Sequence, residues 1–229
     1  MRAVVEGRVF VQEHPVRFAG GSLLTRMTAL VLDDGGVLLH SPIPIDEALR
    51  EEIARIGEVR ALLAPSTCHH VFVADAQRAF PGVPTYGIEG LERKRPDLGL
   101  LPLPDELWAD ELERTVVGNR VMREWVLLHR ASRTVIAVDL VEHIGDATPG
   151  VDRMMRMWIK LLRMWNKPRA APELRLLTRD RAGARSAIER ILSWDFEKMV
   201  IAHGELFERD AKAALREAWS FVLGPVARA

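Results

Sequence analysis

The chain has 229 residues, of which 48% are hydrophobic and 28% charged, a balance typical of a soluble globular protein. Its 32 Lys and Arg residues cancel its 32 Asp and Glu residues, so no global field attracts nucleic acid, and we expect no nucleic-acid partner. The single cysteine, Cys68, excludes an internal disulfide, and no apolar run approaches the ~20 residues that cross a bilayer, so we expect no membrane-spanning segment.

The first forty residues predict β-structure without an export signal. The start, MRAVVEGRVF, lacks the apolar run and small-residue cleavage site of a signal peptide, so we expect a cytoplasmic protein. The runs AVVEGRVFVQ, LLTRMTALVL and GVLLH carry alternating apolar and β-branched residues, which predicts strands. Residues Asp33 to Gly36 form a turn signal between the second and third of these runs.

A helix and a buried strand follow. Asp46 caps a predicted helix over DEALREEIARIG, in which Leu49, Ile53 and Ile56 recur at helical spacing before Gly57. The nearly all-apolar run VRALLA predicts a strand that is covered on both faces. A long turn, ALLAPSTCHHVFVADAQRAFPGVPTYG, overlaps the end of this strand and continues to residue 87.

The second half begins with β-structure near Leu112 and ends in helices. The runs ERTVVG, VMREWVLL and TVIAVDL predict strands, and helical periodicity covers residues 151–166, 179–193 and 209–222. One more strand is predicted at KMVIAH, and a loop at Pro168 to Pro172. No long linker interrupts this pattern, so we predict a single domain over residues 1–229, with sheets packed face to face and helices outside.

Polar side chains that bind metal ions stand where several predicted strands end. His70 follows VRALLA, Asp139 closes TVIAVD, and His203 closes KMVIAH. Strand ends hold side chains in fixed positions, and zinc or iron takes imidazole and carboxylate ligands. For His14 and His129 we expect ordinary hydrogen-bonded roles on the surface or in the core.

The order and spacing of these residues resemble the metallo-β-lactamase-like hydrolase superfamily, from about Thr28 to the final helix. The segments RMTALVLDDGGVLLHSPIPID, LLAPSTCHHVF, LLHRASRTVIAVDL and DFEKMVIAHGE are most similar to a mainly bacterial group within it to which no reaction is assigned. The resemblance implies an α+β fold, the αββα four-layer sandwich.

The resemblance also implies that the metal-binding motif is degenerate. In the superfamily, the strand equivalent to VRALLA is followed by Thr-His-x-His-x-Asp-His. Here Ala64 takes the threonine position, and the three histidine positions of one metal site are occupied by Pro65, Thr67 and Asn119. Proline has no side-chain donor, so this site is expected to be lost.

The other metal site keeps a potential ligand at each position: His69, His70, Asp139 and His203. The resemblance thus implies one zinc or iron ion and a hydrolase of ester, thioester, amide or phosphodiester bonds, with an unidentified small-molecule substrate. His40, Asn119 and His143 are expected to orient a ligand or contact the substrate. Cys68 is expected to be a small packed residue rather than a nucleophile.

The alternative is a member of the fold that has lost its metals, binds no cofactor, and acts as a binding or assembly module through residues 153–165. In this segment, basic residues follow one helical face and Met, Trp, Ile and Leu cover the rest. The helix could pack on the sheet, close over the site, form a homodimer, or lie on an anionic membrane. Among the last three roles, a lid or a dimer contact is favoured.

Overall fold

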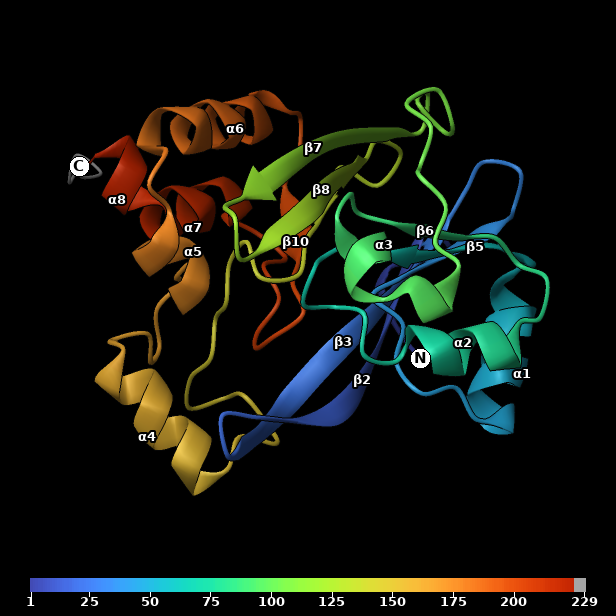
Figure 1. The fold of residues 1–229 in the computed structure, drawn as a ribbon, viewed down its shortest axis with the longest axis horizontal. Coiled ribbons are helices and arrows are strands. Elements are labelled where there is room, and N and C mark those ends of the chain that lie inside the picture. Colours follow the sequence, from blue (N-terminus) through green and yellow to red (C-terminus); the bar gives the residue numbers. More distant parts are fainter. Residues whose placement is uncertain (225–229) are drawn as a thin grey trace.

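Two β-sheets lie at the centre of the computed structural model, which describes residues 1–224 (Figure 1). The larger sheet contains β1 (Arg2–Val5), β2 (Val9–Phe18), β3 (Gly21–Val31), β4 (Val37–His40), β5 (Val59–Ala64) and β6 (Thr85–Gly87), in that order. The strands β1 to β4 pair antiparallel, whereas β4, β5 and β6 are parallel. The helices of this half are α1 (Glu47–Ile56), α2 (Val73–Ala79), α3 (Leu91–Lys94) and the 3₁₀ helix Pro96–Leu98.

The smaller sheet has the order β10-β9-β8-β7. Its strands are β7 (Leu112–Gly118), β8 (Arg123–His129), β9 (Thr134–Ile136) and β10 (Lys198–Val200), and β9 and β10 are parallel. The helices of the second half are α4 (Arg153–Leu161), α5 (Pro172–Leu177), α6 (Arg181–Ser193), α7 (Ala211–Ala218) and α8 (Ser220–Leu223). Within residues 1–224, no helix has both the length and the apolar character needed to cross a membrane.

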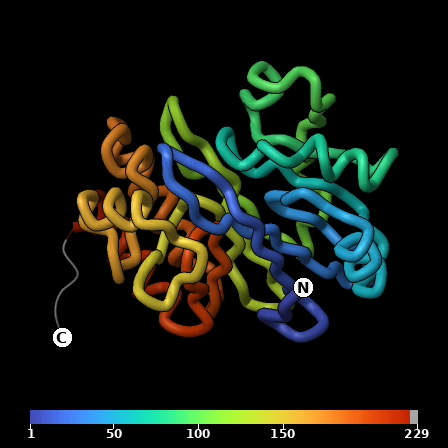
Figure 2. Tube along the Cα trace, turned by 90° about the horizontal axis from the view of Figure 1, so that it is seen from below, coloured from blue at the N-terminus to red at the C-terminus, as the bar shows by residue number. Residues whose placement is uncertain are grey.

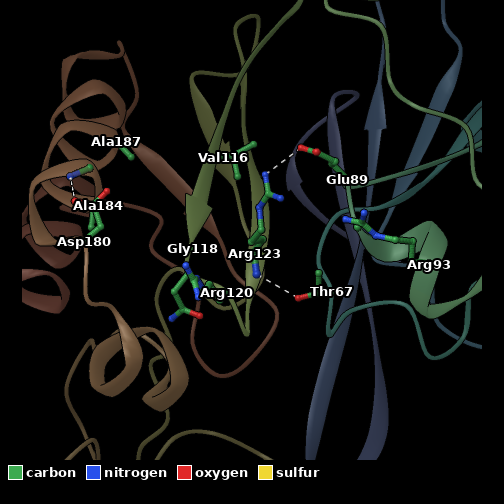
Figure 3. A pocket seen from close by; sticks show the side chains of 13 residues that line it. Thr67, Glu89, Arg93, Val116, Gly118, Arg120, Arg123, Asp180, Ala184 and Ala187 are labelled. Carbon is green, nitrogen blue, oxygen red and sulfur yellow. Dashed lines mark hydrogen bonds and ion pairs between the residues drawn. The ribbon is translucent and has the colours of Figure 1, made fainter.

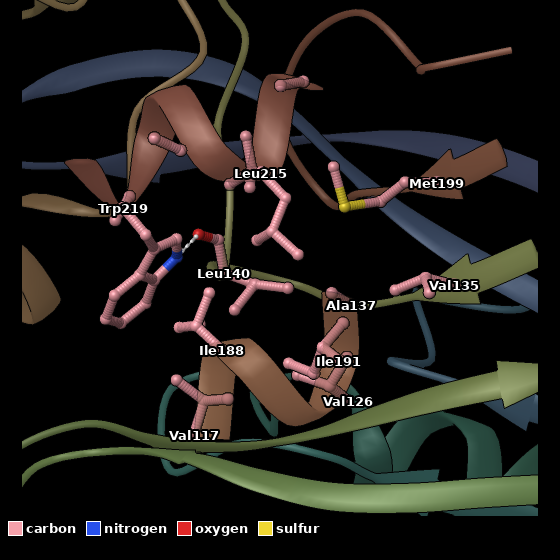
Figure 4. Packing of buried hydrophobic residues seen from close by; sticks show 14 of the residues in the cluster. Val117, Val126, Val135, Ala137, Leu140, Ile188, Ile191, Met199, Leu215 and Trp219 are labelled. Carbon is pink, nitrogen blue, oxygen red and sulfur yellow. Dashed lines mark hydrogen bonds between the residues drawn. The ribbon is translucent and has the colours of Figure 1, made fainter. Parts of the chain in front are cut away.

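Apolar side chains fill three spaces between four layers. One buried cluster joins the facing sides of the two sheets and includes Leu63 and Leu127. A second lies between the larger sheet and α1, around Ile53. The third lies between the smaller sheet and the helices α5 to α8, where the indole of Trp219 donates to the carbonyl of Leu140 at 2.9 Å (Figure 4). The expected αββα sandwich is therefore confirmed.

Several elements differ from their predicted bounds. The helix predicted over 151–166 ends at Leu161, because the chain turns at Arg163 and Asn166, which both adopt positive φ. A helix, α5, begins at Pro172 inside the predicted loop, since proline is compatible with the first position of a helix. The strand predicted over 134–140 ends at Ile136.

The C-terminal helix is split in two, and the long turn contains a helix that we did not predict. The helix predicted over 209–222 is interrupted at Trp219, which separates α7 from α8. Residues 73–79 form α2, which covers the larger sheet. The alternation of small, polar and apolar residues in VADAQRA is too short to distinguish a helix from a loop.

Candidate metal centre

Three side chains from distant parts of the chain converge at one edge of the two sheets. One ligand atom from each of His69, Asp139 and His203 lies within 4.8 Å of the other two. The Nε2 atom of His69 lies 3.3 Å from Oδ1 of Asp139, and Nε2 of His203 lies 3.7 Å from the same oxygen. All three side chains are nearly buried. We call these residues the metal group.

Parallel strand pairs explain the convergence. His69 follows β5, which pairs in parallel with β4, while Asp139 and His203 follow the parallel strands β9 and β10. The carboxyl ends of parallel strands meet at the same edge of a sheet, and ligand sites in such sheets form just beyond it. Since the two sheets face each other, both edges contribute to one site.

His203 is held in the form that binds a metal. Its Nδ1–H donates to the carbonyl oxygen of Leu24 at 2.9 Å, so the lone pair of Nε2 is on the side of Asp139. Burial, together with the electrostatic effect of the neighbouring His69 imidazole, lowers the pKa of His203 to about 4. The imidazole is therefore neutral at ordinary pH, as a metal ligand must be.

His69 is oriented by Ser41, a residue that sequence reasoning missed. Its Nδ1 lies 2.9 Å from the buried hydroxyl of Ser41, and a proton held between these atoms leaves the Nε2 lone pair free. Ser41 has a φ of 54°, a left-handed conformation that is costly for a residue other than glycine. A polar residue directly after the strand GVLLH was the available signal.

Asp139 is positioned through its backbone by a second missed residue, Glu124. The Oε2 atom of Glu124 accepts from the backbone N–H groups of Val138 at 3.0 Å and Asp139 at 2.9 Å. Burial and the charge of Asp139 raise the pKa of Glu124 to about 8. A glutamate directly before the apolar residues WVLL in the strand run VMREWVLL was the signal in the sequence.

The Asp139 carboxyl group has one oxygen that the protein leaves unsatisfied. Burial alone would raise its pKa, but the imidazoles of His69 and His203 outweigh this effect and lower the pKa. Its Oδ2 atom is buried without a hydrogen-bond partner. A buried anionic oxygen without a partner is costly and calls for a cation.

The metal group fits the dimensions of a zinc site. Ligand atoms ~2.0–2.2 Å from zinc in a tetrahedral arrangement lie roughly 3.3–3.6 Å apart. The separations of 3.3 and 3.7 Å are close to this range. Two imidazoles and one carboxylate also form a ligand set that zinc and iron accept.

His70, expected as a fourth ligand, is placed outside this group. Its Nδ1 lies 3.2 Å from the guanidinium of Arg95. Burial, followed by the charges of Lys94 and Arg95, lowers its pKa. Cys68 is exposed rather than packed, so that expectation was wrong.

The other candidate residues also lie outside the metal group. The amide of Asn119 accepts from the backbone N–H groups of Val121 and Met122 and donates to the carbonyl of Glu173 at 3.0 Å, so it closes a turn. His143 stacks on Phe207. His40 is fully buried, and its Nε2 has no partner.

Pro65 and Thr67 stand at the other two positions where the superfamily has histidine, and they connect the two halves of the molecule. The carbonyl of Pro65 accepts from Trp125 N–H at 2.7 Å, and the Thr67 hydroxyl accepts from Arg123 N–H at 3.2 Å. These bonds join the turn after β5 to strand β8. The hydroxyl of Thr67 therefore has a structural role, whereas the bond at residue 65 uses only the backbone.

A third missed residue, Arg26, supports the loop that carries His203. Its buried guanidinium donates to the carbonyls of Ile201 and Gly204, the latter at 2.7 Å, and pairs with Glu13. The isolated arginine in LLTRMTALVL was the signal. Gly204 has a φ of 92°, and a Cβ there would overlap the carbonyl oxygen of His143.

A pocket of about 610 Å³ opens beside the turn that carries His69. Thr67 and Asn119 line it, together with Arg93, Arg120 and Arg123 (Figure 3). Arg123 pairs with Glu89 at 3.3 Å on one wall, while Asp180 caps helix α6 on the opposite wall. The arginines give the lining an excess of positive charge.

Solved structures resemble the whole chain. VMB-1 aligns with a TM-score of 0.64 and 7% identity, over 97% of this chain and 95% of that chain. A metallo-β-lactamase from Erythrobacter litoralis, with β-mercaptoethanol in its active site, aligns with a TM-score of 0.63 and 13% identity, over 98% and 96%. The metallo-β-lactamase FIM-1 from Pseudomonas aeruginosa, in its mono-zinc form, aligns with a TM-score of 0.60 and 13% identity, over 97% and 95%. No protein-family model and no curated protein matches the sequence.

Proposed function

The chain has the metallo-β-lactamase fold, and within it we propose that His69, Asp139 and His203 bind one zinc or iron(II) ion for a hydrolytic reaction. The observation that carries the proposal is the unpartnered buried Oδ2 of Asp139 in a group whose two imidazoles face the same carboxylate. A protein seldom leaves such an oxygen without a compensating partner.

The number of ligands favours a catalytic over a structural ion. Structural zinc sites usually have four protein ligands, whereas catalytic sites have three and keep one position open. His70 is turned toward Arg95, which leaves three donors here. When bound, the ion would polarise a carbonyl or phosphoryl oxygen and lower the pKa of a coordinated water.

Residues around the metal group would hold its three ligands in position for the reaction. Ser41 fixes His69, the Leu24 carbonyl fixes His203, and Glu124 fixes the backbone of Asp139. Because Asp139 is assigned as a ligand, it is not also the general base. The bond that is cleaved belongs to the class of esters, thioesters, amides or phosphodiesters.

The arginine-lined pocket is the place we assign to the substrate's non-reacting part. Thr67 lines this pocket and is two residues from His69, so a bound molecule could extend from one to the other. Arg93, Arg120 and Arg123 would favour a substrate with an anionic group, because guanidinium groups bind carboxylates and phosphates through paired hydrogen bonds.

Metal analysis of protein purified without a histidine tag tests the proposal. We expect about one equivalent of zinc or iron in the wild type and none in His203→Ala. His70→Ala is the matched control and should keep its metal, because His70 lies outside the metal group. A folded wild type that stays metal-free in excess zinc would overturn the proposal and leave a non-catalytic binding module.

A further inference from the structure

Helix α4 has three distinct faces. Met155 and Ile159 are buried in a small cluster with Leu23 and Ile144, which attaches the helix to the start of β3. A second face carries Met154, Met157, Trp158 and Leu161, spaced i, i+3, i+4 and i+7, which places them on one side of a helix. These four side chains are between 39% and 68% exposed. We call them the apolar stripe.

The third face is basic and borders the apolar stripe. Arg153, Arg156 and Lys160 lie at i, i+3 and i+7 on it, and no acidic residue occurs from residue 153 to residue 172. The guanidinium of Arg156 and the ammonium of Lys160 both lie over the ring of Trp165. This local charge contrasts with the zero net charge of the chain.

The helix is held firmly against the β2–β3 hairpin (Figure 2). Asp152 caps α4 by accepting from Met155 N–H, and its other oxygen accepts from Ser22 N–H, both at 2.8 Å. Gly21 lets the backbone of Met155 approach, since a Cβ at Gly21 would lie 2.8 Å from Met155 N. Phe18, at the tip of the same hairpin, is 60% exposed.

We propose that the apolar stripe and its basic border bind the surface of an anionic lipid membrane. Interfacial helices combine apolar and aromatic residues on one face with Lys and Arg on another, and the positive charge is attracted to anionic headgroups. Trp158 is of the residue type that favours the membrane interface. Phe18 adds an exposed apolar side chain at the end of β2, in the hairpin whose second strand contacts α4.

Charge favours a membrane over a second copy of the chain. In a symmetric contact between two α4 helices, the stripes could pack, but the basic borders would lie near each other, and Asp146, which lies beside Arg156 and Lys160, offsets only part of their charge. An anionic lipid surface instead neutralises all of these charges. The proposal concerns a surface separate from the metal group and does not depend on metal binding.

Co-sedimentation with vesicles tests the proposal. We expect the full-length protein to bind vesicles of phosphatidylcholine and phosphatidylglycerol in equal parts, and to bind phosphatidylcholine vesicles at least about ten-fold less tightly. Leu161→Ser and Met157→Ser should each lower the partition coefficient about ten-fold, because each removes one inserted apolar side chain. Lys160→Gln should lower it about five-fold, and the loss should shrink at high salt.

Matched controls separate this surface from general effects. Val121→Ser removes an exposed apolar side chain elsewhere, and Arg55→Gln removes one positive charge from α1. Both should bind anionic vesicles as the wild type does. Near-ultraviolet circular dichroism verifies that each variant is folded. Equal binding to both vesicle types, or no binding to either, overturns the proposal. If the protein then forms a dimer in solution that Leu161→Ser dissociates, the partner of the apolar stripe is a second copy of the chain.

Discussion

Gly204 is the residue at which the backbone around His203 has the least freedom. It has a φ of 92°, and a Cβ at this position would overlap the carbonyl oxygen of His143. That carbonyl accepts from Glu205 N–H at 2.7 Å, and the N–H of His143 donates to the carbonyl of His203 at 3.3 Å, so the close approach is fixed on both sides of Gly204. Gly204→Ala should therefore lower the free energy of unfolding by about 3 kcal/mol or more, since backbone strain and steric overlap add. Urea denaturation measures the change.

Gly82→Ala is the control for conformational strain alone. Gly82 has a φ of 82° but no atom within 4 Å of the place a Cβ would occupy. We expect this variant to lose only about 1–2 kcal/mol and to bind metal normally, whereas Gly204→Ala should also lose metal affinity. If the two variants lost equal free energy of unfolding, the overlap between residue 204 and His143 would be relieved without loss of stability.

His40 should make the metal-free protein sensitive to acid. Burial, with the electrostatic effect of the neighbouring His69 imidazole, lowers the pKa of folded His40 to about 3, below the value of 6.5 for a free histidine. The unfolded chain thus binds a proton that the folded chain rejects, and stability is lost as the pH falls from 6.5 toward 3. The slope approaches about 1.4 kcal/mol per pH unit for this one group.

His40→Gln isolates this contribution. The glutamine side chain does not titrate, so the free energy of unfolding, measured in chelator by urea denaturation, should fall less steeply below pH 6.5 than in the wild type. The comparison uses slopes, because the substitution itself can shift stability at every pH. Parallel curves for the two proteins would contradict a neutral buried His40.

The residues of the metal group could be predicted in part from the sequence. Asp139 and His203 stand out because each follows a predicted strand, and His69 was named only through the resemblance. His70 shows the limit of this reasoning, since neighbouring residues in a turn point in different directions that depend on φ and ψ. Ser41, Glu124 and Arg26 act through contacts far along the chain, which no local pattern records.

At the scale of the elements, the side chain of Glu124 accepts backbone hydrogen bonds that a neighbouring strand would otherwise accept. Strand β9 ends at Ile136, and the side chain of Glu124 on β8 satisfies the next N–H groups, those of Val138 and Asp139. Glu124→Ala leaves two buried N–H groups unpaired, and we expect a loss of about 2–5 kcal/mol together with weakened metal binding.

Glu124→Gln is the matched variant. Its amide oxygen can accept both hydrogen bonds, so stability should stay much closer to that of the wild type. Chemical denaturation and zinc titration measure the two effects. If alanine and glutamine weakened zinc binding equally, the carboxyl group itself, and not the hydrogen bonds to Val138 and Asp139, would be the important property.

Most of the strands and the four-layer arrangement could be expected from hydrophobic patterning and the resemblance, but element ends could not. The run VRALLA marks a buried strand because it is nearly all apolar, and the apolar alternation in VMREWVLL marks a strand of a hairpin. Helices α2 and α5 are six or seven residues long and are stabilised mainly by packing, so their local signals are weak. Helix α4 ends early because Arg163 adopts a positive φ and the N–H of Met164 bonds back to the carbonyl of Ile159, which closes the helix end.

At the scale of the molecule, an ion in the metal group would hold the two sheets together. His69 follows a strand of the larger sheet, whereas Asp139 and His203 follow strands of the smaller one. Zinc at about 100 times its dissociation constant should therefore raise the free energy of unfolding by about 2.7 kcal/mol. Scanning calorimetry with zinc or with chelator measures this, and His203→Ala should show no difference between the two conditions.

The hydrogen bonds at Pro65, Thr67 and Asn119 have a consequence for how this centre could change. A histidine at 119 would give up the bonds to Val121, Met122 and Glu173, and one at 67 would give up the bond to Arg123. Each of these two substitutions alone would thus weaken the fold. A histidine at 65 would keep the bond to Trp125, because that bond uses the backbone carbonyl. Position 65 is therefore the one of the three at which a histidine would cost the fold no hydrogen bond.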